Sequence, residues 1–210
     1  MIVIWGTRTA GKTDQREGQY ALTRFAHVYW IPLFPVSAMW VTRDGVGHQT
    51  KMSGKSVVAG YARTWGPIFT AAGICGLVSL PVAIAAVSLT ALAWAWKDVS
   101  GESAKRKSDL NALAFGTRCE PKLLPGELAD GIKLELDRKW AVISNGQSPD
   151  EVARFGTDDV ERAATAYGLL RLAALKLPSS QAREAEGHAN RLAEGVRDKL
   201  ALGPGGPYRT

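Results

Sequence analysis

The sequence predicts an α+β membrane protein with a small antiparallel β module, one kinked hydrophobic membrane helix and a C-terminal bundle of three to four helices. Three observations support this fold class. Residues 68–96 contain no charged side chain, residues 20–42 are rich in aromatic and β-branched residues, and residues 125–202 repeat apolar positions at helical spacing. An uncharged apolar run of more than about eighteen residues is typical of a membrane segment.

The predicted organisation has six parts along the 210 residues. They are a β module (1–52), a juxtamembrane helix (53–67), a membrane segment (68–96), a charged connector (97–124), a helical bundle (125–202) and a flexible tail (203–210).

Positive charge is concentrated at the front of the chain. Residues 1–67 hold eight Lys and Arg against three Asp and Glu, whereas residues 97–210 hold eighteen against seventeen. The cations of the front are spread evenly and do not cluster with aromatic residues, so nucleic acid is not an expected partner. We expect instead a bilayer with anionic headgroups, contacted by the module from the cytoplasmic side of a bacterial inner membrane. The headgroup-contacting cations are predicted to be Lys97, Lys105, Arg106 and Lys107.

The front begins with a short apolar strand followed by Gly6–Thr13, which matches the phosphate-binding loop pattern. In that pattern backbone N–H groups surround phosphates, the lysine reaches the terminal phosphates and the threonine hydroxyl binds Mg²⁺. Such a loop needs a helix after it, and Gly18 interrupts the next stretch. We therefore interpret Gly6, Gly11, Lys12 and Thr13 as a glycine-rich β-turn that imitates the motif.

Residues 20–42 are expected to form two or three short antiparallel strands broken by Pro32 and Pro35. Together with the start, Ile2–Thr7, the segment His27–Pro35 resembles the zinc-ribbon-like module of small bacterial membrane proteins. That family uses two Cys-x-x-Cys pairs, and this part of the chain has no cysteine. The resemblance therefore implies a ribbon without metal, held by the packing of aromatic residues: Trp5, Phe25, Tyr29, Trp30, Phe34 and Trp40.

The membrane segment is expected to have interfacial anchors at both ends, Trp65 on one side and Trp94 and Trp96 on the other. Its 29 residues would measure about 43 Å as one helix, more than the ~30 Å of a hydrocarbon core. Pro81 is therefore predicted to kink a spanning helix, and a re-entrant hairpin is the alternative.

The rear of the chain carries local helix signals. Ser148-Pro149-Asp150-Glu151 is a capping box, Thr157–Asp159 opens a further helix, and Ser179-Ser180 opens the last. Asp150 and Asp159 suit the positive end of a helix dipole better than acid–base catalysis. Cys119 has one histidine in the same part of the chain, His188, but a structural thiol is the favoured interpretation.

These patterns predict no catalytic site, no cofactor, no metal site and no identifiable small-molecule substrate. We expect an integral membrane protein that acts by protein–protein interaction or as an assembly component. Two alternatives stay open at this point. One is a nucleotide-binding protein that uses Gly6–Thr13. The other is a homo-oligomeric structural subunit that packs through Gly73, Gly76 and the alanines after Pro81.

Overall fold

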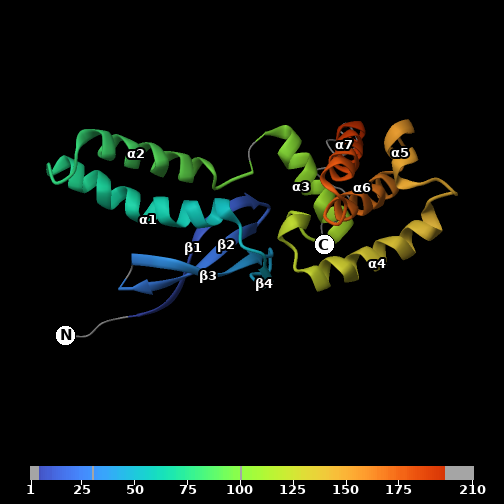
Figure 1. Cartoon of the computed structure of the whole chain (residues 1–210). Helices are drawn as coiled ribbons and strands as arrows, with labels where there is room; N and C mark the ends of the chain where they lie inside the picture. The colour runs from blue at the N-terminus through green and yellow to red at the C-terminus, as the bar shows by residue number, and fades with distance from the viewer. Residues whose placement is uncertain (1–4, 30, 100, 197–210) are drawn as a thin grey trace. The chain divides into compact units, whose positions relative to one another are not determined.

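The structure, a computed structural model, describes residues 5–29, 31–99 and 101–196 and shows an α+β chain of two compact units (Figure 1). The division falls between Ser100 and Gly101. The predicted membrane helix is wrong, because no helix in the described ranges is both long and apolar enough to cross a bilayer. The predictions made for Ile2–Ile4, Trp30, the end of the bundle beyond residue 196 and the tail 203–210 fall on residues outside those ranges.

The first unit is built on a four-stranded antiparallel sheet in the order β1-β2-β3-β4. Consecutive strands are neighbours, which short turns between them allow. The strands are β1 (Trp5–Arg16), β2 (Gln19–Val28), β3 (Ile31–Val41) and β4 (Gly47–Thr50). In β2, burial alternates along Ala21, Thr23 and Phe25, so one face of the sheet is covered.

Helix α1 (Gly54–Ile74) covers that face and approaches the sheet backbone closely. The buried Ser56 hydroxyl accepts a hydrogen bond from the Thr23 hydroxyl at 2.9 Å and donates to the Gly11 carbonyl at 2.6 Å. A Cβ atom at Gly60 would lie 2.6 Å from the Phe25 ring. Small residues on the facing side of α1 are therefore what allows the helix to lie against the strands.

The uncharged run forms parts of two helices rather than one. Helix α1 starts well before the run, includes Arg63 and continues through Pro67, whereas α2 (Leu80–Ala95) has 16 residues. Between them the chain turns, with Gly76 at a φ of +70° that favours glycine. Pro81 lies in the first turn of α2, where its missing N–H costs nothing, and so starts a helix instead of kinking one.

Helices α1 and α2 pack side by side as a hairpin through small residues (Figure 1). A Cβ at Gly66 would lie 1.7 Å from Thr90 Oγ1, and a Cβ at Gly73 would lie 2.3 Å from the Ala83 Cβ. Ala86 and Ala93 of α2 are buried. The sequence suggested that Gly73 packs against another copy of the chain. In the structure Gly73 packs against Ala83 within the hairpin.

The second unit contains five α-helices in its described part, and four of them, α4 to α7, lie in the range 125–202 where a bundle of three to four helices was expected. The α-helices are α3 (Glu102–Phe115), α4 (Gly126–Ile143), α5 (Pro149–Phe155), α6 (Val160–Ala174) and α7 (Ser179–Gly195), with a 3₁₀ turn, η1 (Pro121–Leu123), after α3. Helix α3 lies in the segment predicted as a connector. The capping box at Ser148 and Glu151 is present, and the Asp159 side chain caps α6.

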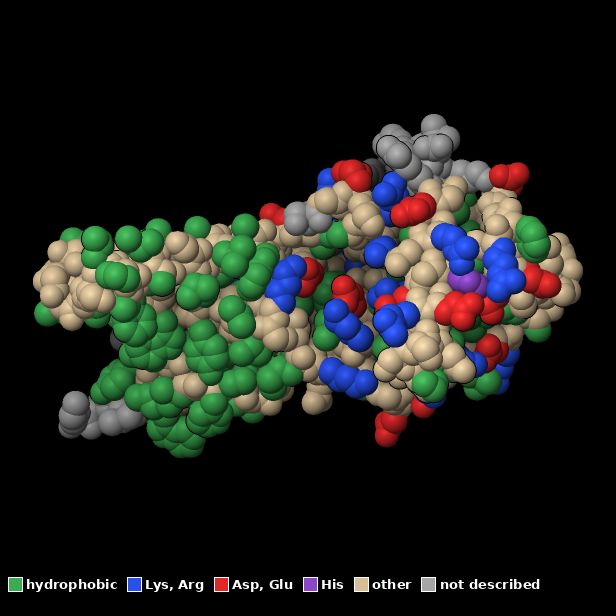
Figure 2. All heavy atoms as spheres, turned by 45° about the horizontal axis from the view of Figure 1, so that its top comes forward, with side chains coloured by type: hydrophobic (Ala, Val, Ile, Leu, Met, Phe, Trp, Pro, Cys, Tyr) green, Lys and Arg blue, Asp and Glu red, His purple; other side chains and the backbone are tan. Residues whose placement is uncertain are grey.

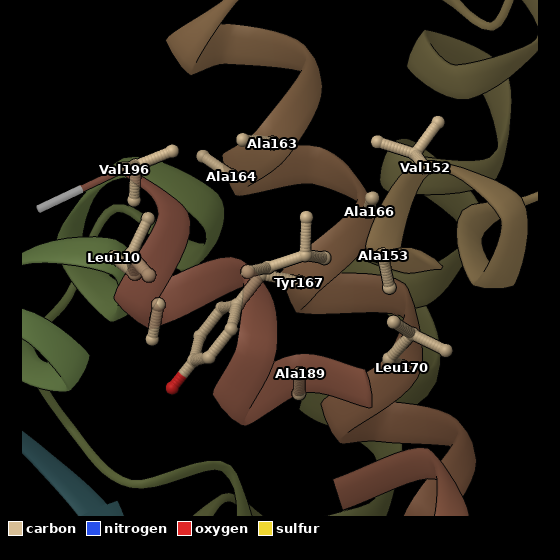
Figure 3. Close-up of a cluster of buried hydrophobic side chains, with 12 residues drawn as sticks. Leu110, Val152, Ala153, Ala163, Ala164, Ala166, Tyr167, Leu170, Ala189 and Val196 are labelled. Carbon is tan, nitrogen blue, oxygen red and sulfur yellow. The ribbon is translucent and has the colours of Figure 1, made fainter. Parts of the chain in front are cut away.

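Helix α6 is the centre of this unit, because α3, α4, α5 and α7 all contact it. Figure 3 shows Tyr167 of α6 among Leu110, Ala189 and Val196, which come from α3, α7 and the residue after α7. A Cβ at Gly168 would lie 2.9 Å from side-chain atoms of Ala114 and Leu136. Alanine and glycine on α6 therefore let its neighbours pack closely around it.

Replacing Gly66 by Ala should destabilise the first unit by about 1–3 kcal/mol, because the new methyl overlaps Thr90. Thr90 Oγ1 would also lose its hydrogen bonds to the Ala62 and Ala86 carbonyls. Gly54→Ala is the matched control, since nothing lies within 4 Å of a Cβ there. Thermal unfolding of both variants measures the difference, and equal stabilities would contradict the close contact.

The stability of the second unit should fall at alkaline pH because of Tyr167. Burial raises the pKa of its phenol above the usual value of about 10, with Arg171 opposing and Glu120 adding to the effect. As pH rises, the unfolded chain loses this proton first, so stability present below pH ~10 is lost as pH passes through the folded-state pKa. Tyr167→Phe removes the effect, while losing the hydrogen bond to Asn111 Oδ1.

Urea unfolding at several pH values from about 8 to 11 checks this expectation. The free-energy difference between the native protein and Tyr167→Phe should be constant up to pH ~9 and shrink above it. A difference that stays constant through the whole range would show that Tyr167 ionises equally easily in the folded and unfolded chains.

Candidate interaction surface

The close packing of small residues inside the hairpin leaves its large apolar side chains outside. Ile74 is 83% exposed, Leu77 is 78% and Leu80 is 72%, all at the turn between the helices. Figure 2 shows hydrophobic side chains gathered over the hairpin, and this part of the visible face carries no Lys, Arg, Asp or Glu side chain. A contiguous apolar surface of this kind marks a place where something else binds.

A groove of about 410 Å³ runs between α1 and α2 on one side of the hairpin. Nearly all of its walls are apolar, and both helices contribute. Its lining residues are Val58, Tyr61, Ala62, Trp65, Gly66 and Phe69 of α1, and Val82, Ala85, Ala86 and Leu89 of α2. Four of the lining residues are exposed to solvent, so the apolar groove is bordered by exposed apolar side chains: Val58, Phe69, Val82 and Leu89.

The sheet holds α1 in place beside this groove. Tyr61 donates a hydrogen bond from its hydroxyl to the Leu33 carbonyl at 2.7 Å, and Trp65 donates from Nε1 to the Pro32 carbonyl at 3.4 Å. The Tyr61 ring also meets the Phe25 ring edge to face, with centroids 5.1 Å apart. The aromatic wall of the groove is therefore fixed by the β2–β3 end of the sheet.

The four residues predicted as membrane anchors have structural partners or defined positions in the first unit. Trp65 lines the groove, and Pro81 starts α2. Trp94 is exposed and lies under the Arg63 guanidinium, which is 5.2 Å from its ring centroid. Trp96 ends α2, and its carbonyl accepts a hydrogen bond from the Asp14 N–H at 3.4 Å.

The cations predicted to contact headgroups lie in different parts of the chain. Lys97 follows α2, and its carbonyl accepts a hydrogen bond from the Gln15 N–H at 2.8 Å. Lys105, Arg106 and Lys107 belong to α3, where Lys105 forms an ion pair with Glu102 at 2.9 Å.

The Gly6–Thr13 segment lies within strand β1 and not in a loop before a helix. Gly11 has a φ of +73°, and a Cβ there would lie 1.9 Å from the Ser56 carbonyl oxygen. The Lys12 ammonium sits 3.7 Å from the Tyr20 ring centroid, and Thr13 is fully buried. Residues 5–16 thus lack the loop shape that would surround phosphates. Gly11, the second glycine of the motif, instead lies in a β-bulge that packs against α1.

The remaining candidates for chemistry are in the second unit. Cys119 is buried, and its thiol donates to the Glu120 carbonyl at 3.6 Å. His188, also buried, has Nδ1 2.7 Å from Asp150 Oδ1. The described ranges contain no group of three or more His, Cys, Asp and Glu side chains arranged to hold a metal ion.

Sequence reasoning missed the groove residues of α2, although a signal for them exists. Val82, Ala85 and Leu89 recur at spacings of three and four, as do Val58, Ala62, Trp65 and Phe69. The same spacing in both segments indicates two helix faces that can flank one groove, once a turn between them is assumed.

Comparisons of this chain with protein families, curated proteins and solved structures found no match of any of the three kinds.

Proposed function

We propose that this chain is an assembly protein that acts by protein–protein association, with the groove face of its α1–α2 hairpin packing against the same face of a second copy. The observation that supports the proposal is the groove itself. It is a concave apolar surface between α1 and α2, and the small residues that hold these two helices together leave its large apolar side chains without a partner in the hairpin. Leaving such a surface in water is unfavourable by about 25 cal/mol per Å² of apolar area.

The groove face offers both a hollow and exposed apolar side chains, which are the two features that pairing with an identical face requires. Phe69 and Leu89 are exposed beside the hollow, and in the proposed dimer the hollow of each copy receives these side chains of the other. None of the residues that line the groove is charged, so two such faces can meet without burying an unpaired ion. A face that pairs with itself around a two-fold axis gives a closed dimer, the commonest assembly of soluble proteins.

The concave shape also supports a protein occupant. Protein side chains fill discrete hollows as knobs, and buried aromatic and aliphatic anchors supply most of the binding energy at interfaces. Trp65 and Phe69 provide such anchors, with ring centroids 6.0 Å apart. The proposal includes no catalytic step.

Sedimentation velocity of the full chain in detergent-free buffer tests this function through Leu89→Lys. The native protein should sediment as a dimer, and Leu89→Lys should weaken association at least about tenfold, because the lysine ammonium would be placed in an apolar interface. Ile84→Lys is the matched control: it also replaces an aliphatic residue of α2 by lysine at a similar exposure, 57% against 53%, and Ile84 is not among the residues that line the groove.

Two results would overturn the proposal. A native protein that is monomeric in buffer and associates only with lipid vesicles would show that the occupant is not a second copy. Equal loss of association in Leu89→Lys and Ile84→Lys would show that the groove face is not the interface. Circular dichroism confirms that each variant keeps its helices.

A further inference from the structure

A second hollow in the first unit, of about 390 Å³, differs from the groove in its chemistry. Its lining includes two arginines and a histidine, and none of the described Asp or Glu residues belongs to it. The residues around it are Arg8, Thr9, Ala10, Phe25, His27, Pro32, Arg63, Thr64 and Pro67. Hollows of this size lie within the usual range for small-molecule sites.

The fold brings the cationic side chains together from strands and helix. Arg8 is paired with Phe25 across β1 and β2, so both side chains lie on one face of the sheet. His27 is two residues after Phe25 on β2 and shares that face, which α1 covers. Arg63 and Pro67 lie one turn apart on α1 and follow Gly60, which contacts Phe25. The site thus combines residues separated by more than fifty positions in the chain.

Two residues that line this hollow carry a polar atom without a partner in the part of the chain that the structure describes. His27 Nδ1 and Arg63 Nε are buried without a hydrogen bond. The other Arg63 nitrogens donate to the Lys12 and Ala93 carbonyls, and no carboxylate of the described residues forms an ion pair with its guanidinium. Burial lowers the pKa of Arg63 below its usual value, which is the effect of removing a cation from water without an anion nearby.

We propose that this hollow binds a phosphate-bearing anion, with Arg8, His27 and Arg63 as its recognition residues. Two guanidinium groups and an imidazole can donate to different oxygens of a tetrahedral phosphate, whereas a carboxylate is already satisfied by one arginine. Phe25, Pro32 and Pro67 supply an apolar wall for the organic part of a phosphomonoester. The phosphate could belong to a soluble ester or to a lipid headgroup, and the chemistry of recognition is the same. The site is independent of the groove and of any dimer.

Proton NMR of the histidine rings in the full chain locates binding directly. The chain has three histidines, His27, His48 and His188, so the last two serve as internal references. Adding inorganic phosphate, and then glycerol 3-phosphate, should shift the His27 signals in a saturable manner and leave the other two unchanged. Acetate at equal concentration should bind about tenfold more weakly or not at all.

Arg8→Gln should weaken phosphate binding at least about tenfold, because a charge-assisted hydrogen bond is lost. Arg24→Gln is the matched control: it removes the same charge from an exposed residue of β2 that does not line the hollow and that precedes Phe25, so its side chain lies on the opposite face. Vesicles with and without phosphatidic acid distinguish a lipid headgroup from a soluble phosphate ester as the ligand. A site for headgroups should bind the vesicles that contain phosphatidic acid and should not bind the soluble ester. No saturable shift of His27 with any phosphate compound, equal affinity for acetate, or equal loss in the two arginine variants would overturn the proposal.

Discussion

The contact between α1 and α2 determines the surface of the first unit. Gly66 and Gly73 leave no room for a side chain where they face Thr90 and Ala83, so the two helices lie close together. Because small residues fill the inside of the hairpin, the large apolar residues must point outward. The sequence is apolar throughout this region, and the packing decides which part of it is exposed. The proposed self-association follows from this arrangement, in which small residues lie inside the hairpin and large apolar residues lie on its surface.

The sheet and the hairpin are joined through a small number of polar contacts. Arg63 donates to the Lys12 carbonyl of β1 and to the Ala93 carbonyl of α2, so one side chain links strand and hairpin. Ser56 links the sheet to the start of α1, where Gly11 allows close approach. These contacts give the Gly6–Thr13 segment a structural reason for residues that also match a phosphate-binding loop. The β-bulge requires glycine at position 11, and the Lys12 side chain packs over the Tyr20 ring.

Features encoded by neighbouring residues could be predicted from the sequence, and features set by distant contacts could not. The capping box at Ser148 and the start of α6 at Asp159 follow from local hydrogen bonds. The turn at Gly76 was missed, because an unbroken apolar run hides a helix boundary and Pro81 fits a kink as well as a helix start. Phe25 and Trp40 are buried as expected, whereas Trp5 and Phe34 are exposed. The hollow around Arg8, His27 and Arg63 depends on strand register, which the sequence alone does not reveal.

The most direct test of the central claim is the distance between the hairpin ends of two copies. Cys75 at the end of α1 is exposed, so after Cys119→Ser it is the only thiol and can carry a spin label. Because α2 is about 24 Å long, hairpins that overlap along it place the two Cys75 positions between direct contact and roughly that separation. Pulsed electron paramagnetic resonance in detergent-free buffer should give one defined intermolecular distance in this range. The absence of any dipolar coupling between copies would contradict the account.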